Sequence, residues 1–332
     1  MSIPNRGWVL ASRPDGPVQE SNFRLVEADV PPLEEGQVLA WVHYLSLDPY
    51  MRNRMGTAKS YAPAQALDQV MVGRTIGSVL ESRDPGYRPG EIVLGAGGWQ
   101  LFHVADGPGL SKVDTRVLPE PVFLGAVGMP GVTAWYGLLK IGRPRSGETV
   151  VVSAASGAVG SVVGQLAKLN GCRAVGIAGG SPKCQHVVEK LGFDACIDYK
   201  STTFLDAFQA ATPSGIDVLF ENVGGWVLEA ALDRMNPFGR IVVCGLIAGY
   251  NGEQIPLRNV RAILVNRLAV QGFIVTDHLD QWSEAIGELG TLVAQGRVKH
   301  HETIAEGLEN APRAFIGLLR GENLGKQLVK LA

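Results

Sequence analysis

Cysteine is scarce in this chain, with four in 332 residues and none before residue 172. None of the four belongs to a CxxC pair, and all lie on or beside expected strands and helices; they are Cys172, Cys184, Cys196 and Cys244. Neither a disulfide framework nor a cysteine-rich zinc site has this spacing. The pattern indicates reduced structural thiols.

Excess charge of one sign and long apolar runs are also missing. The 30 Lys and Arg residues nearly balance the 32 Asp and Glu residues, and the net charge of −2 gives no field that would attract nucleic acid or an anionic membrane. The N-terminus has no apolar segment of signal-peptide length, and no apolar stretch is long enough to span a bilayer. We expect a soluble cytoplasmic protein, large enough for two domains.

A strand, a glycine turn and a helix follow one another from Thr149 onward. The β-branched run at residues 149–152 is typical of a buried parallel strand, and Gly157 and Gly160 come shortly after it. Apolar residues then fall at helical spacing as far as the Asn-Gly pair at 170–171, and a second apolar run covers 174–178. Glycines at these places let the backbone approach a pyrophosphate, which binds at the helix N-terminus. The pattern predicts a dinucleotide site.

No acidic residue occurs in AGGSPK at 178–183, the segment after the second strand. An NAD site usually has an Asp or Glu about 20 residues after the glycine turn, where it binds the ribose hydroxyls. A carboxylate there would repel a 2′-phosphate, whereas Ser181 and Lys183 attract one, so the segment predicts NADP(H). The alternative is that Ser181 caps the next helix and Lys183 is a solvated surface lysine. A P-loop is excluded, because no Lys-Ser or Lys-Thr follows the glycine turn.

The pattern of expected elements changes near Gly131. Short strands separated by Gly and Pro precede it and suggest a barrel-like β-domain, with strands at 8–11, 23–28, 38–47, 73–81, 92–95 and 101–104. Strands alternate with helices after it, and the six strands at 149–152, 174–178, 195–199, 216–222, 240–245 and 268–274 suit a doubly wound sheet. Helices are expected at 226–235, 282–293 and 311–319, and a last strand is expected to pair back into the first domain.

Seven motifs occur in order along the chain: LDPYMRNRM at 47–55, GMPGVTAWYGL at 128–138, SAASGAVGS at 153–161, KLGFDACIDYK at 190–200, ENVGG at 221–225, CGLIAGYN at 244–251 and GENLGK at 321–326. Nearly end to end, the chain resembles the zinc-free, NADPH-dependent alkenal and alkenone double-bond reductases of the medium-chain dehydrogenase/reductase superfamily. This group includes the prostaglandin reductases, the leukotriene B4 dehydrogenases and the bacterial curcumin reductases. The resemblance implies an α/β fold, with a Rossmann doubly wound parallel sheet at 129–297 and a GroES-like β-barrel domain at 1–128 and 298–332. It also implies that NADP(H) lies in the cleft between these domains.

The same resemblance assigns cofactor contacts one position at a time. Lys183 matches a lysine on the 2′-phosphate, Tyr199 a tyrosine at the same end of the cofactor, and Asn222 a residue at the ribose or pyrophosphate edge. Met129 and Thr133 match residues beside the nicotinamide. For Tyr199, Met129 and Thr133 the alternative is a packing role. The whole expected set is Met129, Thr133, Ser156, Gly157, Ala158, Val159, Gly160, Gly179, Ser181, Lys183, Tyr199, Asn222, Cys244, Gly245, Tyr250, Phe273 and, from the tail, Asn323.

Zinc chemistry is disfavoured by composition. Alcohol-oxidising members of the superfamily hold a catalytic zinc with Cys and His, because a Lewis acid must polarise the oxygen. The N-terminal domain here has no cysteine and only His43 and His103. Reduction of a C=C bond conjugated to a carbonyl has another requirement: hydride reaches the β-carbon, and donors must stabilise the enolate oxygen. A tyrosine or water then protonates the α-carbon.

Three tyrosines are the expected donors. Tyr250 follows the fifth strand of the expected sheet, on the carboxyl side where ligands bind, and matches the family tyrosine near the nicotinamide ribose and the substrate. Tyr50, in DPYMR, and Tyr61, in the polar loop at 56–69, are expected on the opposite wall. The alternative for each is a half-buried ring with its hydroxyl at the surface.

The expected partner is a small enone or enal substrate, with no nucleic acid and no membrane, and the resemblance implies a homodimer. Two other functions stay open. One is an NADPH:quinone oxidoreductase of the same superfamily, and the other is a non-catalytic NADPH-binding protein.

Overall fold

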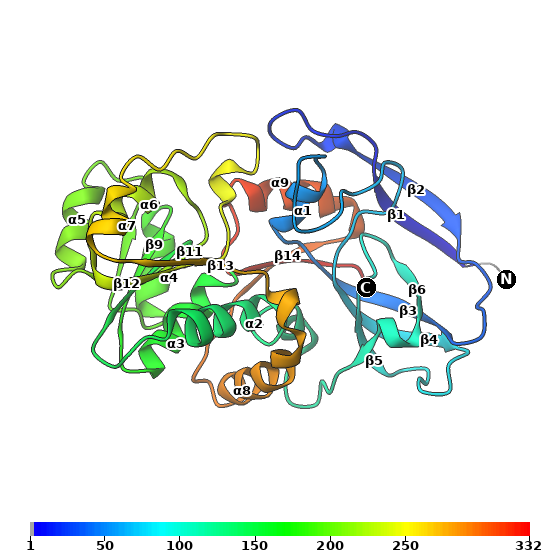
Figure 1. The fold of residues 1–332 in the computed structure, drawn as a ribbon. Coiled ribbons are helices and arrows are strands. Elements are labelled where there is room, and N and C mark those ends of the chain that lie inside the picture. Colours follow the sequence, from blue (N-terminus) through cyan, green and yellow to red (C-terminus); the bar gives the residue numbers. More distant parts are fainter. Residues whose placement is uncertain (1–2) are drawn as a thin grey trace. The chain divides into compact units, whose positions relative to one another are not determined.

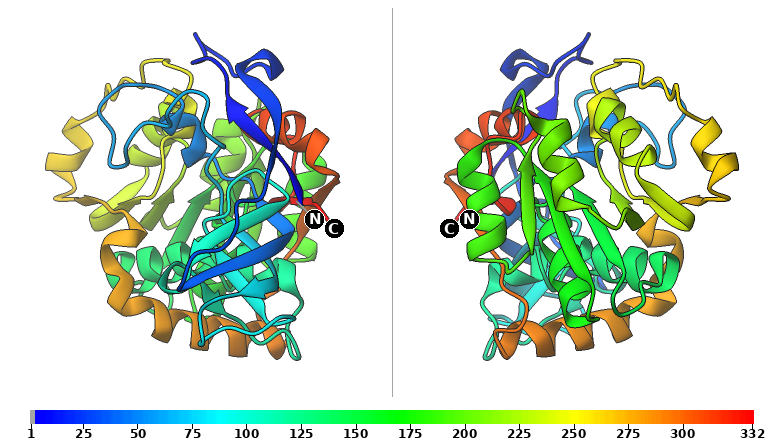
Figure 2. Two further views of the ribbon diagram at one scale, coloured as in Figure 1. Left: turned by 90° about the vertical axis from the view of Figure 1, so that its right-hand side faces the viewer. Right: turned by 90° about the vertical axis from the view of Figure 1, so that its left-hand side faces the viewer.

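The computed structural model describes residues 3–332 and divides the chain into two units (Figure 1). One unit comprises Met1–Leu124 and Glu302–Ala332, and the other comprises Gly125–His301. The C-terminal segment therefore returns to the unit in which the chain begins, and Figure 2 shows it in red beside the blue N-terminal strands. Within residues 3–332, every helix is too short or too polar to cross a membrane.

A six-stranded parallel sheet forms the centre of the unit Gly125–His301. Neighbouring strands pair in the order β10-β9-β8-β11-β12-β13, and every pair is parallel. This is the strand order of a doubly wound dinucleotide-binding fold, so the predicted α/β class is confirmed. The strands are β8 (Thr149–Ser153), β9 (Arg173–Ala178), β10 (Ala195–Asp198), β11 (Ile216–Glu221), β12 (Met235–Val243) and β13 (Ala269–Gly272).

Helices cover both faces of this sheet. Val151, Val175 and Leu219 point to one face, where they pack with side chains of α5 (Phe204–Ala211) and α6 (Gly225–Leu232). The residues between them along each strand point to the other face, because successive side chains of a strand alternate. There α3 contacts β8 and β9, and Figure 1 shows α2, α3 and α8 on the same side; these helices are α2 (Met129–Trp135), α3 (Gly160–Leu169) and α8 (Trp282–Ala294).

Most strands of the other unit pair antiparallel in one seven-stranded sheet. Its order is β14-β15-β3-β4-β5-β7, with β6 on β3, and only the β14–β15 pair is parallel. The pairing of β15 with β3 confirms that the last strand returns to the first domain. The strands are β3 (Gln37–Ser46), β4 (Thr75–Ser82), β5 (Ile92–Gly95), β6 (Phe102–Asp106), β7 (Ser111–Lys112), β14 (Glu302–Glu306) and β15 (Lys326–Lys330).

An aromatic cluster anchors the rest of this unit. The Trp99 ring stacks on Phe23 at 5.3 Å and meets Phe315 edge-on at 5.5 Å. Phe23 begins β2 (Phe23–Asp29), which pairs with β1 (Pro4–Leu10), and Phe315 lies on α9 (Ala311–Leu319). The cluster therefore joins the first hairpin to the C-terminal helix, which lies where the sequence predicts it.

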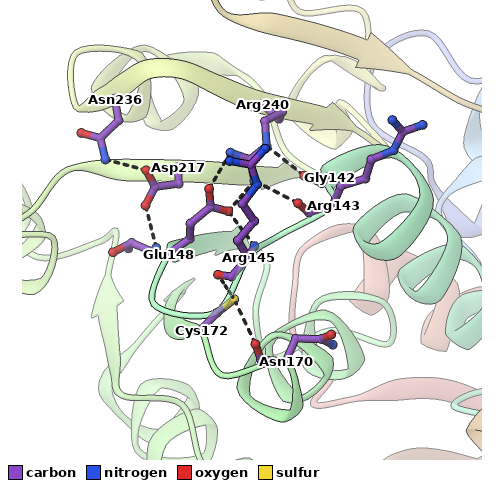
Figure 3. A network of polar contacts seen from close by, with 10 residues as sticks. Gly142, Arg143, Arg145, Glu148, Asn170, Cys172, Asp217, Asn236 and Arg240 are labelled. Carbon is purple, nitrogen blue, oxygen red and sulfur yellow. Dashed lines mark hydrogen bonds and ion pairs between the residues drawn. The ribbon is translucent and has the colours of Figure 1, made fainter.

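A polar network ties the starts of neighbouring strands at the amino end of the parallel sheet (Figure 3). Arg240 donates to both carboxylate oxygens of Glu148 and to Gly142 O. Asp217 accepts the Thr149 N–H at 2.8 Å and the side-chain amide of Asn236 at 2.8 Å. Burial alone would raise the pKa of Glu148, but the bonds from Arg240 and the Arg145 N–H hold it below its usual range. The carboxyl end of the sheet lies opposite this network.

One predicted helix boundary is wrong. The helix expected at 226–235 ends at Leu232, and Met235 already belongs to β12. Met235 pairs with Ile216 at the start of β11, and the Arg234 guanidinium donates to Thr212 Oγ1 at 2.6 Å. Sheet pairing thus overrides an apolar pattern that continues the helix.

Close packing of α3 on the sheet side depends on Gly164. A Cβ at this position would lie 1.8 Å from the Phe193 ring, so Gly164→Ala should lower the free energy of unfolding by about 2 kcal/mol through overpacking. Gly287 is the matched control: it lies inside α8 with nothing within 4 Å of its Cβ position. Gly287→Ala should stabilise the protein by about 0.5–1 kcal/mol through helix propensity. Thermal and urea unfolding check both values, and equal effects of the two substitutions would contradict this account of α3 packing.

Candidate functional site

The turn between β8 and α3 brings two parts of the backbone very close together. Ala154 has a left-handed backbone with φ +51°, which is uncommon for a residue other than glycine, and its carbonyl accepts the Gly157 N–H at 2.9 Å. A Cβ on Gly160 would lie 2.4 Å from Ala154 O, so glycine is required there. The N–H groups of Ser161, Val162 and Val163 bond to Gly157 O and Val159 O at 3.0–3.1 Å, and the positive end of the α3 dipole points to this turn. Such a turn suits a pyrophosphate; its other predicted positions are Ser156, Ala158 and Val159.

Two lysines lie together where the sequence predicts the 2′-phosphate site. A Cβ on Gly179 would lie 3.2 Å from Lys200 Cε and 2.9 Å from the Tyr199 ring. Lys183 is half-buried, and burial together with the Lys200 charge lowers its pKa. A phosphate bound by both ammonium groups would relieve their repulsion. The structure thus brings Gly179, Lys183 and Tyr199 together and adds Lys200, which the sequence analysis missed although it ends the KLGFDACIDYK motif.

The carboxylate of Asp198, next to this pair, is bonded to the backbone. Its Oδ1 accepts the Gly180 N–H at 2.8 Å and the Lys200 N–H at 2.9 Å, which ties the ends of β9 and β10 together. Gly180, with φ +93°, is the N-cap of α4 (Ser181–Glu189), and no side chain caps this helix. The alternative role of Ser181 as a helix cap is therefore wrong, since Ser181 is the first helical residue.

A buried carboxylate shapes the turn after β11. Glu221 Oε1 accepts hydrogen bonds from Ser153 Oγ at 3.0 Å and from the N–H groups of Val223 and Gly224, both at 2.6 Å. Ser153 Oγ accepts the Asn222 N–H at 2.8 Å, and Asn222 Nδ2 donates to Ser153 O at 2.8 Å. Burial raises the pKa of Glu221, although these bonds act in the opposite direction. The arrangement fixes Asn222 at the carboxyl ends of β8 and β11, with its amide nitrogen engaged by the protein.

Tyr250 reaches back to the ends of β11 and β12. It follows the short helix η5 (Ile247–Gly249), and a Cβ on Gly245 would lie 3.4 Å from the Tyr250 hydroxyl oxygen and 3.3 Å from Asn222 O. The structure therefore brings Tyr250, Gly245 and Asn222 together. Burial and the nearby charge of Glu221 raise the pKa of Cys244 to about 12. Its thiol stays protonated at neutral pH and does not act as a nucleophile.

An aromatic group lies beside the helical segment that carries Met129 and Thr133. The Phe273 ring, just after β13, is 5.8 Å from the ring of Tyr136, and His278 stacks on Tyr136 at 4.2 Å. Thr133 Oγ1 donates to Met129 O at 2.7 Å, so this hydroxyl is engaged inside α2. The sequence analysis missed Tyr136 and His278. A helical tyrosine gives no indication of which distant rings stack on it.

Two predicted tyrosines belong to the unit of Met1–Leu124 and Glu302–Ala332. Tyr50 begins α1 (Tyr50–Arg54), and burial, followed by the charge of Asp48, raises its pKa. Tyr61 is close enough to contribute to the same effect, although its own side chain is exposed. A raised pKa keeps the Tyr50 hydroxyl protonated and able to donate a hydrogen bond.

Asn323, the predicted contact from the tail, lies in the turn before β15. Its Nδ2 donates to Gly325 O at 2.8 Å, and Leu324 exchanges hydrogen bonds with Thr303 Oγ1 through its N–H at 3.0 Å and its carbonyl at 2.7 Å. The turn is thus held by β14, and the side-chain oxygen of Asn323 is not used in these bonds.

Both ring nitrogens of His43 are engaged within the protein. Nδ1 lies 2.8 Å from Glu120 Oε2, and Nε2 lies 3.0 Å from Ser78 Oγ. His103 is half-buried, and burial lowers its pKa. Among residues 3–332, no three His, Cys, Asp or Glu side chains are grouped so that they could hold a metal ion, and the four cysteines are free thiols.

Known proteins match the chain over nearly its whole length. Residues 6–113 match the family described as N-terminal domain of oxidoreductase, and residues 158–291 match the family described as zinc-binding dehydrogenase. NADPH-dependent curcumin reductase of Escherichia coli (strain K12) is 47% identical over 335 residues, which cover 99% of this chain and 97% of that protein. Prostaglandin reductase 1 of Rattus norvegicus is 41% identical and covers 99% of both chains. The crystal structure of CurA in complex with NADPH from Vibrio vulnificus is 44% identical, with a TM-score of 0.95, and covers 98% of this chain and 99% of that one.

Proposed function

Because the chain belongs to the zinc-free alkenal and enone reductase group of the medium-chain dehydrogenase/reductase superfamily, we propose that it reduces the C=C bond of α,β-unsaturated aldehydes and ketones with NADPH. The relatives place it among NADPH-dependent oxidoreductases. The observation that carries the finer assignment is the position of the Tyr250 hydroxyl, beside Gly245 and Asn222 at the carboxyl edge of the sheet.

The unit Gly125–His301 has the features that NADPH needs. The close approach at Gly160 suits the pyrophosphate, and the half-buried Lys183 with Lys200 suits the 2′-phosphate. The rings of Phe273 and Tyr136 provide an apolar surface near Met129 and Thr133 for the nicotinamide. When bound, the cofactor supplies the hydride that reaches the β-carbon of the substrate.

The protein's part in the chemistry is to stabilise charge and to manage a proton. The Tyr250 hydroxyl donates to the substrate carbonyl oxygen as negative charge builds there, with a ribose hydroxyl as the second donor. The enolate then takes a proton at the α-carbon from a tyrosine or water. Tyr50 and Tyr61 line the substrate side, and the raised pKa of Tyr50 suits a hydroxyl that must remain a donor. In this proposal residues 1–128 and 298–332 form the substrate domain, and residues 129–297 form the cofactor domain.

A substrate panel tests the function directly. NADPH oxidation should be fast with short alkenals or aryl enones and slow with simple quinones, and the product should be the saturated carbonyl compound. Consumption of NADPH by quinones alone would assign the protein to quinone reduction. NADPH binding without turnover on any compound would assign a binding role and refute the proposal.

Tyr250→Phe should lower kcat on an enone by about 10²-fold, because one donor to the developing oxyanion is lost, while the Kd for NADPH changes little. Tyr87→Phe is the matched control, since the Tyr87 hydroxyl donates to Gly107 O and Leu110 O within the β-domain. Steady-state kinetics and NADPH fluorescence titration give both numbers. Unchanged kcat in Tyr250→Phe would remove Tyr250 from the mechanism.

Lys183→Ala should raise the KM for NADPH about tenfold and leave the KM for NADH nearly unchanged, because only NADPH carries the 2′-phosphate. Lys190→Ala, at the other end of α4, is the matched control and should change neither value. Initial rates with each cofactor measure the discrimination. Equal changes for NADPH and NADH would show that Lys183 does not contact the 2′-phosphate.

The proposed assembly is a homodimer joined through β13. This strand ends the parallel sheet, and all four of its residues are exposed. Side chains near this edge are unusually apolar for a surface: Val270 is 47% exposed, Val265 48% and Leu264 78%. An edge strand with such neighbours suits pairing with a second copy of the chain.

Light scattering after size exclusion should give twice the 35.4 kDa chain mass for the wild type and a single chain mass for Val270→Lys. Val117→Lys, at an exposed valine in the other unit, is the control and should leave the mass unchanged. A wild type with the mass of one chain would contradict the dimer.

A further inference from the structure

A lysine that belongs to neither the cofactor set nor the substrate set is buried in the β-domain. Lys326 begins β15, and its side chain is 3% exposed. Its ammonium lies 3.1 Å from Asp48 Oδ1 and donates to Leu47 O at 2.6 Å and Gln327 O at 3.0 Å. Ser46 Oγ donates to the other oxygen of Asp48. All three ammonium hydrogens therefore have acceptors, and both carboxylate oxygens are engaged.

These contacts lie where the pairing of β3 with β15 stops. The paired residues end at Leu328 opposite Ser46, and one further bond joins Leu47 N–H to Gln327 O at 3.2 Å. Beyond that point the ammonium of Lys326 replaces the backbone hydrogen bonds between the two strands, because it donates to a carbonyl of each chain segment, Leu47 O and Gln327 O. It joins residues 279 positions apart in the sequence.

Both chain segments that continue from this point carry residues assigned to the site. Asp48 is followed by Pro49 and then by Tyr50, the first residue of α1. On the other strand, Asn323 precedes Lys326 by three positions and lies in the turn held by Thr303. The buried ion pair of Lys326 and Asp48 therefore lies where both segments leave the paired strands.

Stability alone does not explain this choice of residues. Taking two charges out of water costs several kcal/mol, and replacing a buried ion pair by apolar residues of similar volume is often neutral or stabilising. Apolar side chains already fit this face of β15, because Leu328, two residues along the strand, packs in a cluster with Ile76 and Leu124. Apolar contacts are not directional, so an apolar pair could not hold two backbone carbonyls at a fixed separation, whereas an ammonium that donates to both of them can.

We propose that Lys326, through Asp48 and the carbonyls of Leu47 and Gln327, is a positioning residue that holds the Tyr50 and Asn323 segments in register with each other. The inference rests on the proposed function, because Tyr50 and Asn323 are assigned there to the substrate and the cofactor. Asn323 should then affect cofactor affinity, and Tyr50 should affect turnover.

The test compares the full-length wild type with Lys326→Met, the double variant Asp48→Asn with Lys326→Met, and the control Lys112→Met. Lys112 forms an exposed ion pair with Glu91 in the same unit and should have no effect. NADPH Kd from fluorescence titration, kcat and KM on an enone, and the midpoint of thermal unfolding are measured for each. Lys326→Met should raise the Kd about fivefold or more, lower kcat at least tenfold, and lower the unfolding midpoint.

The double variant separates positioning from stability. Because it leaves no unpaired buried charge, its unfolding midpoint should return close to that of the wild type, while the Kd and kcat stay impaired. Wild-type kinetics in the double variant would overturn the proposal, as would unchanged Kd and kcat in Lys326→Met. If Lys326→Met does not fold, the double variant alone decides between these outcomes.

Failure of the proposed function gives a different result. A wild type that binds NADPH but reduces no enone would refute the double-bond reductase assignment, whereas the Kd comparison would still report on Asn323. A raised Kd in the double variant at wild-type stability would then support the positioning role, and an unchanged Kd would reject it.

Discussion

The carboxylate of Glu221, the last residue of β11, bonds to β8 and to the turn that follows β11, and these bonds fix the carboxyl edge of the parallel sheet. Its Oε1 accepts the Ser153 hydroxyl from β8 and two backbone N–H groups of its own turn. Asn222 is fixed as a consequence, and the Tyr250 hydroxyl lies over Asn222 and Gly245. A buried acid is costly, but here its hydrogen bonds replace the ladder that parallel strands lose where they end.

Where β9 and β10 end on the same edge, two like charges lie together, in contrast to the hydrogen-bonded carboxylate of Glu221. Lys183 and Lys200 repel each other, and the nearby Asp198 is bonded to backbone N–H groups. Without an anion this arrangement costs free energy, and a ligand with two negative charges there recovers it. In the proposed function, the preference between two cofactors that differ by one phosphate comes from this pair of lysines in a half-buried place, where the effective dielectric constant is lower than that of water.

Much of the fold could be predicted because local patterns and sheet geometry agree. The run at Thr149, the glycine turn and the helix that Asn170 caps are each local signals, and all three have the predicted form. Met235 shows the limit: it continues the helical spacing of Leu228 and Leu232, but pairing with Ile216 places it in a strand. The missing acid after β9 indicated a phosphate site, whereas Lys200 and the stacking of His278 on Tyr136 depend on contacts between distant segments. The burial of Lys326 has no local signal, since an isolated lysine in a strand is usually solvated.

The return of β15 to β3 also sets the order in which the chain can be completed during synthesis. β3 and its neighbours β4 and β6 are made early, but Lys326, which begins β15 and bonds to Leu47 O, comes 279 residues after Leu47. At about 5–20 residues per second, ribosomal synthesis separates the two by roughly 15–60 s. Over that interval all strands of the parallel sheet emerge and can pair with one another. The β-domain, although it comes first in the sequence, is therefore completed late: β6 can pair with β3 over Gln37–Trp41, but the same edge at Tyr44–Ser46 stays exposed to chaperones or to misplaced pairing until β15 emerges.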